Sequence, residues 1–172
     1  MSTTTSDRSS SPSADGGYAH EHRPLAAYAG LAATSTAAFT AGLLAARRAR
    51  GELPERYSPW DLALVATATH KISRTVTKEK VTSFIRGPFV RYQEPAGFGE
   101  LDETPRGEGL QRAVGELLVC PYCLGHWVAS AFGVGMVGAP RVTRLIAFVF
   151  TAETIADFLQ LAYKKTIDEV GA

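Results

Sequence analysis

The chain has 172 residues, the length of one domain, and its formal net charge is +1. So small a surplus of positive charge argues against nucleic-acid binding, because phosphates are neutralised by many Lys and Arg side chains. The two cysteines belong to one short motif, which excludes a framework of several disulfides.

Residues 1–24 are rich in Ser, Thr, Gly and Asp, and we expect them to form a disordered tail. Residues 25–46 contain no charge, and a spanning helix needs about 20 mainly apolar residues. This run is too long for the apolar core of a secretory signal peptide. We therefore predict a retained membrane helix over 25–46, with a buried Ala-rich helix of a soluble protein as the alternative. A basic connection follows up to residue 57.

The next helix is predicted over 58–77. Ser58 suits the N-cap, Pro59 the first helical position, and Asp61 the acidic position of a capping box. The apolar stretch 62–68 is too short to cross a bilayer, and Lys and Arg occupy another face. We predict an amphipathic helix that does not cross the membrane, with a crossing helix, and so four spans, as the alternative. Residues 91–112 are rich in Gly, Pro and charge, and they predict a loop.

Two further helices are expected in the second half of the chain. Residues 117–140 contain no Asp, Glu, Lys or Arg, and Pro121 suits a first helical position with Cys120 as N-cap. Membrane helices are predicted at about 120–138 and 143–163. The expected fold is an all-α integral membrane bundle with three spanning helices and a cytoplasmic amphipathic helix.

The distribution of basic residues predicts an orientation, because Lys and Arg near spans prefer the cytoplasmic side. The connection 47–59 holds four Arg and residues 71–112 hold eight Lys or Arg. With three spans, the N-terminus lies outside and the C-terminus in the cytoplasm. Fourteen basic residues then lie inside and four outside.

Polar and small residues inside the two last apolar runs predict how these helices pack. Gly125, Ala129 and Gly133 recur every four residues and favour close helix packing. Glu153 and Asp157 lie on one face of the last helix, where they either glue the bundle together or handle ions or protons. If the two helices form an antiparallel hairpin, residues whose numbers sum to about 283 share a depth.

This depth argument pairs polar residues of the two helices. It places Cys123 opposite Gln160, His126 opposite Asp157, and Ser130 opposite Glu153. Because an unpaired Asp in apolar surroundings is costly, we predict a hydrogen bond between His126 and Asp157.

Three segments resemble a family of uncharacterised bacterial membrane proteins, the domain of unknown function 1360 family. They are LALVATATHKISRTVTKEKVTSFIRGPF at 62–89, GEGLQRAVGELLVCPYCLGHWVASAF at 107–132, and the closing acidic helix at 153–163. The chain then divides into the tail 1–24, a first membrane helix with its connection at 25–57, and a family-like domain at 58–172. The resemblance implies a small multi-pass membrane protein and supplies no reaction.

The string CPYCLGHW, residues 120–127, leaves three alternatives open. The residues after the motif are typical of helices and not of strands, which argues against a glutaredoxin fold. Cys120, Cys123 and neighbouring residues could be packing residues at a helix start. Cys120 and Cys123 could be a redox pair, since a helix N-terminus favours thiolate. With His126, and perhaps His70, they could instead bind zinc.

The expected function is that of a non-enzymatic membrane scaffold or interaction protein. A thiol-redox or metal-binding protein that uses the CPYC motif is the alternative. The expected partners are the lipid bilayer and other membrane proteins or a second copy of the chain, without nucleic acid. No cofactor is expected apart from the zinc alternative.

Overall fold

The computed structural model describes residues 23–50, 53 and 56–171, so the tail predicted over 1–24 lies almost wholly outside the described residues. The helices are α1 (Leu25–Arg50), α2 (Pro59–Lys78), the short η1 (Lys80–Thr82), α3 (Ser83–Arg86), α4 (Gly109–Val119), α5 (Pro121–Gly138) and α6 (Pro140–Val170). Two strands, β1 (Val90–Gly97) and β2 (Glu100–Pro105), pair in an antiparallel hairpin. The predicted mainly helical fold is confirmed, but the predicted loop 91–112 is wrong, because most of it forms this hairpin.

The two predicted capped helix starts are confirmed. The Ser58 Oγ accepts a hydrogen bond from the Asp61 amide at 3.1 Å, and Pro59 opens α2. In the same way, the Cys120 Sγ accepts a hydrogen bond from the Cys123 amide at 3.1 Å, and Pro121 opens α5. Both starts depend on groups within three residues of each other, which is why sequence alone locates them.

The hairpin depends on contacts with helices far away in the sequence. Its turn contains Gly97, Phe98 and Gly99, all with positive φ, which glycine adopts readily and Phe rarely. Ion pairs attach β2 to the preceding helices: Arg74 to Glu100, Lys78 to Asp102 at 3.8 Å, and Arg86 to Glu103. A charged, Gly-rich segment therefore forms strands because its charges have fixed partners.

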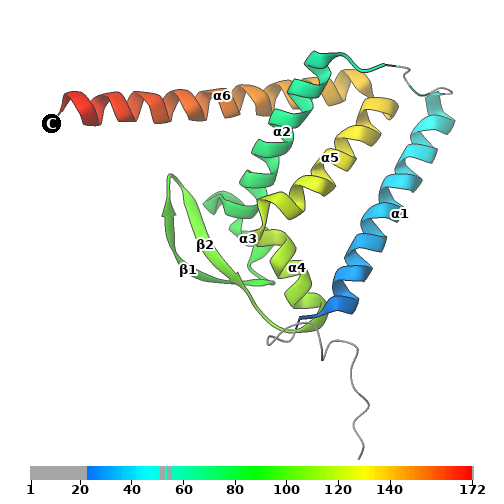
Figure 1. Ribbon diagram of the computed structural model, residues 1–172, viewed down its shortest axis with the longest axis horizontal. Coiled ribbons are helices and arrows are strands. Elements are labelled where there is room, and N and C mark those ends of the chain that lie inside the picture. The colour runs from blue at the N-terminus through cyan, green and yellow to red at the C-terminus, as the bar shows by residue number, and fades with distance from the viewer. Residues whose placement is uncertain (1–22, 51–52, 54–55, 172) are drawn as a thin grey trace, which may run out of the picture.

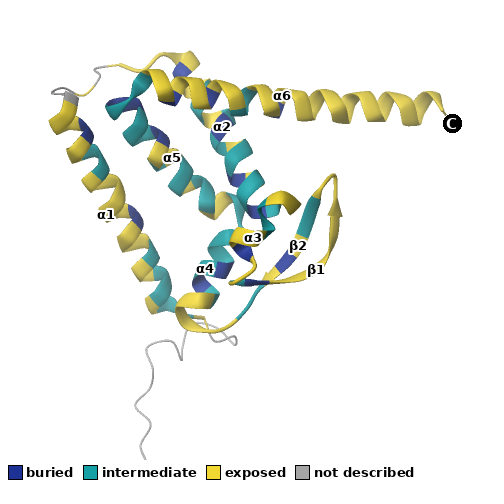
Figure 2. Ribbon diagram, turned by 180° about the vertical axis from the view of Figure 1, so that it is seen from behind, coloured by how far each residue is buried: buried dark blue, intermediate teal, exposed yellow. Residues whose placement is uncertain are grey.

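Helix α2 lies between α5 and α6 at the centre of the bundle (Figure 1). Ala68, halfway along α2, is buried in one cluster with Phe132 of α5 and Ala147 of α6. Helix α1 packs on the other side of α5, where the Cβ position of Gly42 lies 2.9 Å from a Val134 methyl group. Most of α1 and the C-terminal half of α6 are exposed in Figure 2.

Two helices among the described residues, α1 and α6, are long and apolar enough to cross a membrane. Helix α5 meets the same test only together with α4, and these two helices meet at an 84° bend next to Cys120. The fold is therefore compatible with a membrane location, with two such helices, or three if the bent pair forms one span.

The predicted contact between His126 and Asp157 is wrong. The Asp157 carboxylate accepts a hydrogen bond from the Lys71 Nζ at 3.0 Å, and His126 is exposed. Helix α6 packs mainly against α2 rather than α5. The Thr151 hydroxyl of α6, for example, donates a hydrogen bond to the Leu64 carbonyl of α2 at 3.1 Å. The depth argument assumed a hairpin of two helices, but α2 occupies the place on α6 that it assigned to α5.

Candidate functional site

The CPYC motif forms a disulfide at the bend between α4 and α5. Cys120 and Cys123 are joined, with their Cα atoms 5.3 Å apart. Cys120 is half-buried and Cys123 is exposed. Between them, Tyr122 is 92% exposed. The motif thus places a disulfide at the exposed N-terminus of a long helix.

A cavity of about 290 Å³ lies beside this disulfide, between α2 and α5. Its lining residues are Ala66, Thr69, His70, Ser73, Arg74, Pro121, Tyr122 and Gly125. The Thr69 hydroxyl oxygen is buried and has no hydrogen-bond partner among the described residues. At Gly125 a Cβ atom would lie 3.6 Å from the Ser73 Oγ, so the small residue lets α2 and α5 approach closely.

The structure does not assemble the proposed zinc ligands. His126 is exposed on α5, and His70 is exposed on α2. Among residues 23–50, 53 and 56–171, no group of three or more His, Cys, Asp or Glu side chains could hold a metal ion. Because the two sulfurs are bonded to each other, neither is a thiolate ligand in this state.

A second polar site surrounds Lys71, where α2, α6 and the hairpin meet. The Lys71 Nζ lies 2.8 Å from a Glu79 carboxylate oxygen and 3.0 Å from one of Asp157, and its side chain is only 14% exposed. The Thr75 hydroxyl donates to the same Glu79 oxygen at 2.8 Å. Arg74 binds the two carboxylate oxygens of Glu100 at 2.6 and 2.7 Å.

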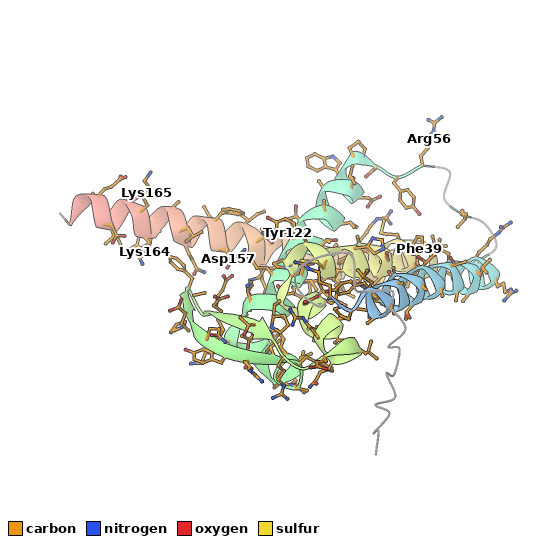
Figure 3. All side chains as sticks on the ribbon, turned by 60° about the horizontal axis from the view of Figure 1, so that its bottom comes forward. Phe39, Arg56, Tyr122, Asp157, Lys164 and Lys165 are labelled. Carbon is orange, nitrogen blue, oxygen red and sulfur yellow. A yellow bond between two sulfur atoms is a disulfide. The ribbon has the colours of Figure 1, made fainter. Side chains whose placement is uncertain are left out.

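These charges line a cavity of about 650 Å³, and Phe98 and Lys164 line it as well. The Lys164 Nζ lies 4.9 Å from the centre of the Phe98 ring, within the range of a cation–π contact. In Figure 3, Lys164 points from α6 toward the hairpin whereas Lys165 points away. Asp157, whose side chain is 51% exposed, thus takes part in a network that joins α6 to α2. Glu153, predicted on the same face, is also exposed.

The predicted packing residues face different neighbours. Gly125 faces α2, whereas the Cβ position of Gly133 lies 3.4 Å from a ring carbon of Phe39 on α1. Ala129 lines an apolar groove of about 670 Å³ between α1, α2 and α5. The small residues therefore accommodate two helices and a groove, not one partner helix.

The sequence analysis missed the Arg86 site and the Asp61–Arg144 pair. Arg86 is fully buried; it pairs with Glu103 and donates to the carbonyls of Val76 at 2.7 Å and Glu79 at 3.1 Å. A lone arginine before Gly87-Pro88 gave no signal of burial. Arg144 binds the two carboxylate oxygens of Asp61 at 2.7 and 3.0 Å, although 83 residues separate them.

Comparison with known proteins assigns a family. The family model described as "Protein of unknown function (DUF1360)" matches residues 64–163. The chain belongs to this family. It is also similar to the UPF0713 protein YngL of Bacillus subtilis (strain 168), with 25% identity over 111 residues, which cover 63% of this chain and 82% of the relative. No solved structure matches.

The DUF1360 match contains the disulfide and the two sites built around Lys71 and Arg86. The match begins at Leu64 on α2 and ends at Tyr163 on α6. The disulfide, the Lys71 network and the Arg86 site therefore all lie within it. Helix α1 lies outside the match and covers one face of α5.

Asp61→Asn is expected to lower stability by about 1–2 kcal/mol, because it removes one charge from a bidentate pair that joins α2 to α6. The measurement is the thermal unfolding midpoint of the purified protein in detergent. Asp168→Asn, at the exposed end of α6, is the matched control and should leave the midpoint unchanged. Equal midpoints for the two variants would show that the pair contributes nothing.

Proposed function

We propose that the protein is a membrane-embedded bundle in which α2 crosses the bilayer together with α1, α5 and α6. The support is the packing of α2 along α5, in the opposite direction. Ser58 and Asp61 share the apolar groove with Met136 and Val137, and at the other end Ser73 faces Gly125. A crossing α5 therefore takes α2 through the same depth.

Two charged residues of α2, Asp61 and Lys71, agree with this proposal because each is paired with a residue of α6. Asp61 pairs with Arg144 and Lys71 with Asp157. The partners on α6 therefore come in the same order along the chain as the residues on α2. Charged groups within a membrane are tolerated where they face the bundle interior and are paired. The prediction of three spans judged α2 by its hydropathy alone. Hydropathy is a criterion for helices that face lipid.

For the orientation, we infer that both termini and the hairpin lie on the cytoplasmic side. The N-terminal part of α1 reaches the hairpin end of the bundle, where the Tyr28 hydroxyl donates to Glu116 of α4. Arg56 lies at the opposite end (Figure 3). Of the 18 Lys and Arg residues, twelve then lie inside and six outside, in keeping with the preference of basic residues for the cytoplasm. This orientation keeps the cytoplasmic C-terminus that the sequence predicts. It puts the N-terminus on the cytoplasmic side instead of the predicted outer side.

The function that this arrangement supports best is that of a non-enzymatic scaffold that presents the hairpin to a partner. The observation that carries it is the attachment of β2 to the helices by three ion pairs, while β1 stays exposed beyond its first residue. A fixed, exposed strand at the end of a membrane bundle is a surface for another membrane protein or a second copy of the chain.

A photo-crosslinking residue in place of Tyr92 on β1 tests the scaffold in cells. We expect a discrete crosslinked species, and no such species from the same residue in place of the buried Phe132. Replacing both cysteines with Ala should leave the crosslink unchanged. No crosslink from Tyr92, or a crosslink that needs the cysteines, would contradict a scaffold that works without thiol chemistry.

A second function, thiol–disulfide exchange, is favoured by the disulfide itself. In the orientation proposed above, the disulfide would face the cytoplasm, which keeps thiols reduced and where such bonds are usually transient and redox-sensing. The same bond argues for redox chemistry over the zinc alternative, because zinc requires the two sulfurs as separate thiolates.

A further inference from the structure

We propose that the apolar groove between α1, α2 and α5 binds an acyl chain of an anionic phospholipid, whose headgroup lies against arginines at the mouth of the groove, the end where α2 begins. This site goes beyond the scaffold function and rests on the membrane-embedded arrangement proposed above. The groove has a volume of about 670 Å³, within the roughly 300–1,000 Å³ of ligand pockets. It is accessible from outside the bundle, since Leu62 in its lining is 70% exposed.

The length of the groove matches one leaflet of a bilayer. On α5 its lining runs from Ala129 to Val137, which is about 12 Å at 1.5 Å per residue. On α2 the lining runs from Pro59 to Val65, which is about 9 Å. Half of the hydrocarbon core of a bilayer is about 15 Å thick. A groove that starts at the membrane boundary therefore ends near the middle of the bilayer, as the acyl chains of one leaflet do.

The lining changes from polar to apolar along the groove, as a phospholipid does from headgroup to chain. Its polar residues, Tyr57, Ser58 and Asp61, all lie at the mouth. The other end is lined by Phe39 of α1 and Val65 of α2. The mouth therefore suits the glycerol and phosphate groups of the lipid, and the deeper part suits its hydrocarbon.

Arginines surround the mouth of the groove. Arg47 follows the lining residue Leu43 by one helical turn, so it lies on the same side of α1. Arg48 is the next residue, and Arg56 directly precedes the lining residue Tyr57. All three arginines are exposed, and residues 47–59 hold four Arg against two Glu. This surplus of positive charge complements a negatively charged headgroup.

The carboxylate at the mouth does not oppose such a headgroup. Asp61 carries the one carboxylate among the described lining residues. Arg144 binds its two oxygens at 2.7 and 3.0 Å, so its charge is balanced. The excess of arginine therefore decides the charge of the ligand.

The test places a small diazirine photo-crosslinking side chain at Leu62 in the full chain. The protein is reconstituted in nanodiscs with equal parts of phosphatidylglycerol, which is anionic, and phosphatidylcholine, which is neutral overall. Leu145 is the matched control position. It is 62% exposed and follows Arg144, the partner of Asp61, so it lies near the level of Leu62 but does not line the groove.

Mass measurement identifies the crosslinked lipid. At Leu62 we expect phosphatidylglycerol to exceed phosphatidylcholine about tenfold, which corresponds to about 1.4 kcal/mol. A few basic residues near an anionic lipid supply a preference of this size. At Leu145 we expect the two lipids in about equal amounts.

The headgroup site is tested by Arg47→Gln, Arg48→Gln and Arg56→Gln in one chain. This variant should lower the ratio of the two lipids at Leu62 to the ratio at Leu145. An unchanged ratio would show that the arginines do not hold the headgroup, and would overturn the proposal.

The control variant combines Lys80→Gln, Arg91→Gln and Lys165→Gln. It removes the same charge from exposed residues outside the groove. It should keep the tenfold preference, and an equal loss of preference in both variants would overturn the assignment to the groove.

The outcomes separate the lipid site from the membrane-embedded arrangement. Equal amounts of the two lipids at Leu62, or lipid crosslinked at Leu145 alone, would overturn the lipid site and leave the arrangement standing. A crosslink from Leu62 to protein would also overturn it, because a partner or a second copy would then fill the groove. If neither position crosslinks to lipid, the membrane-embedded arrangement itself fails.

Discussion

Arg86→Met is expected to lower the stability of the protein by about 3–5 kcal/mol, because it leaves a buried carboxylate without its cation. Arg86 is fully buried and pairs with Glu103, which is 8% exposed. The guanidinium also donates to the Thr82 hydroxyl at 2.8 Å and to the carbonyls of Val76 and Glu79. The Arg86 side chain thus donates hydrogen bonds to carbonyl groups at the C-terminal end of α2 and holds β2 against this helix.

The measurement is the unfolding midpoint in detergent, combined with limited proteolysis of the hairpin. Arg91→Met, on the exposed strand β1, is the matched control and should change neither. Removing the carboxylate as well, in Arg86→Met with Glu103→Leu, should recover part of the loss, since no buried charge then remains unpaired. An Arg86→Met protein as stable as the control variant would show that this site does not hold the hairpin.

Gly115→Ala is expected to destabilise the protein by about 1–3 kcal/mol through overpacking. A Cβ atom at this position would lie 2.5 Å from the Phe89 carbonyl oxygen and 3.2 Å from the Pro105 Cβ. Both neighbours belong to the base of the hairpin, so α4 and the strands have to separate. Backbone atoms cannot avoid the clash by changing a rotamer, as a flexible side chain would.

Gly30→Ala on α1 is the control for the loss of glycine itself. No atom lies within 4 Å of its Cβ position, and Ala is favoured over Gly in a helix by about 1 kcal/mol. The two substitutions should therefore shift the unfolding midpoint in opposite directions. A Gly115→Ala variant that unfolds at or above the wild-type midpoint would contradict the close contact between α4 and the hairpin.

The features that sequence predicted are local ones. Ser58 with Pro59 and Cys120 with Pro121 mark helix starts, because the cap and the amide it satisfies lie three residues apart. The features that sequence missed depend on distant partners. Asp157 binds Lys71 across 86 positions, and the choice between Lys71 and His126 depended on which helix lies beside α6.

The hairpin was missed for a related reason. In the sequence, Glu100 and Glu103 are typical of a solvated loop, because the sequence does not show that Arg74 and Arg86 pair with them. The pairing of Asp61 and Lys71 with α6 is likewise not visible in hydropathy summed along the chain.

The crossing of α2 is the central claim, and labelling from the two sides of the membrane tests it most directly. Single cysteines replace Arg56, before α2, and Glu94, on the hairpin, in a chain whose Cys120 and Cys123 are changed to Ser. A maleimide that does not cross membranes is applied to intact and to permeabilised cells. The account predicts that Arg56→Cys is labelled in intact cells and Glu94→Cys only after permeabilisation. Labelling of both positions from the same side would contradict it, because α2 would then begin and end on one side of the membrane.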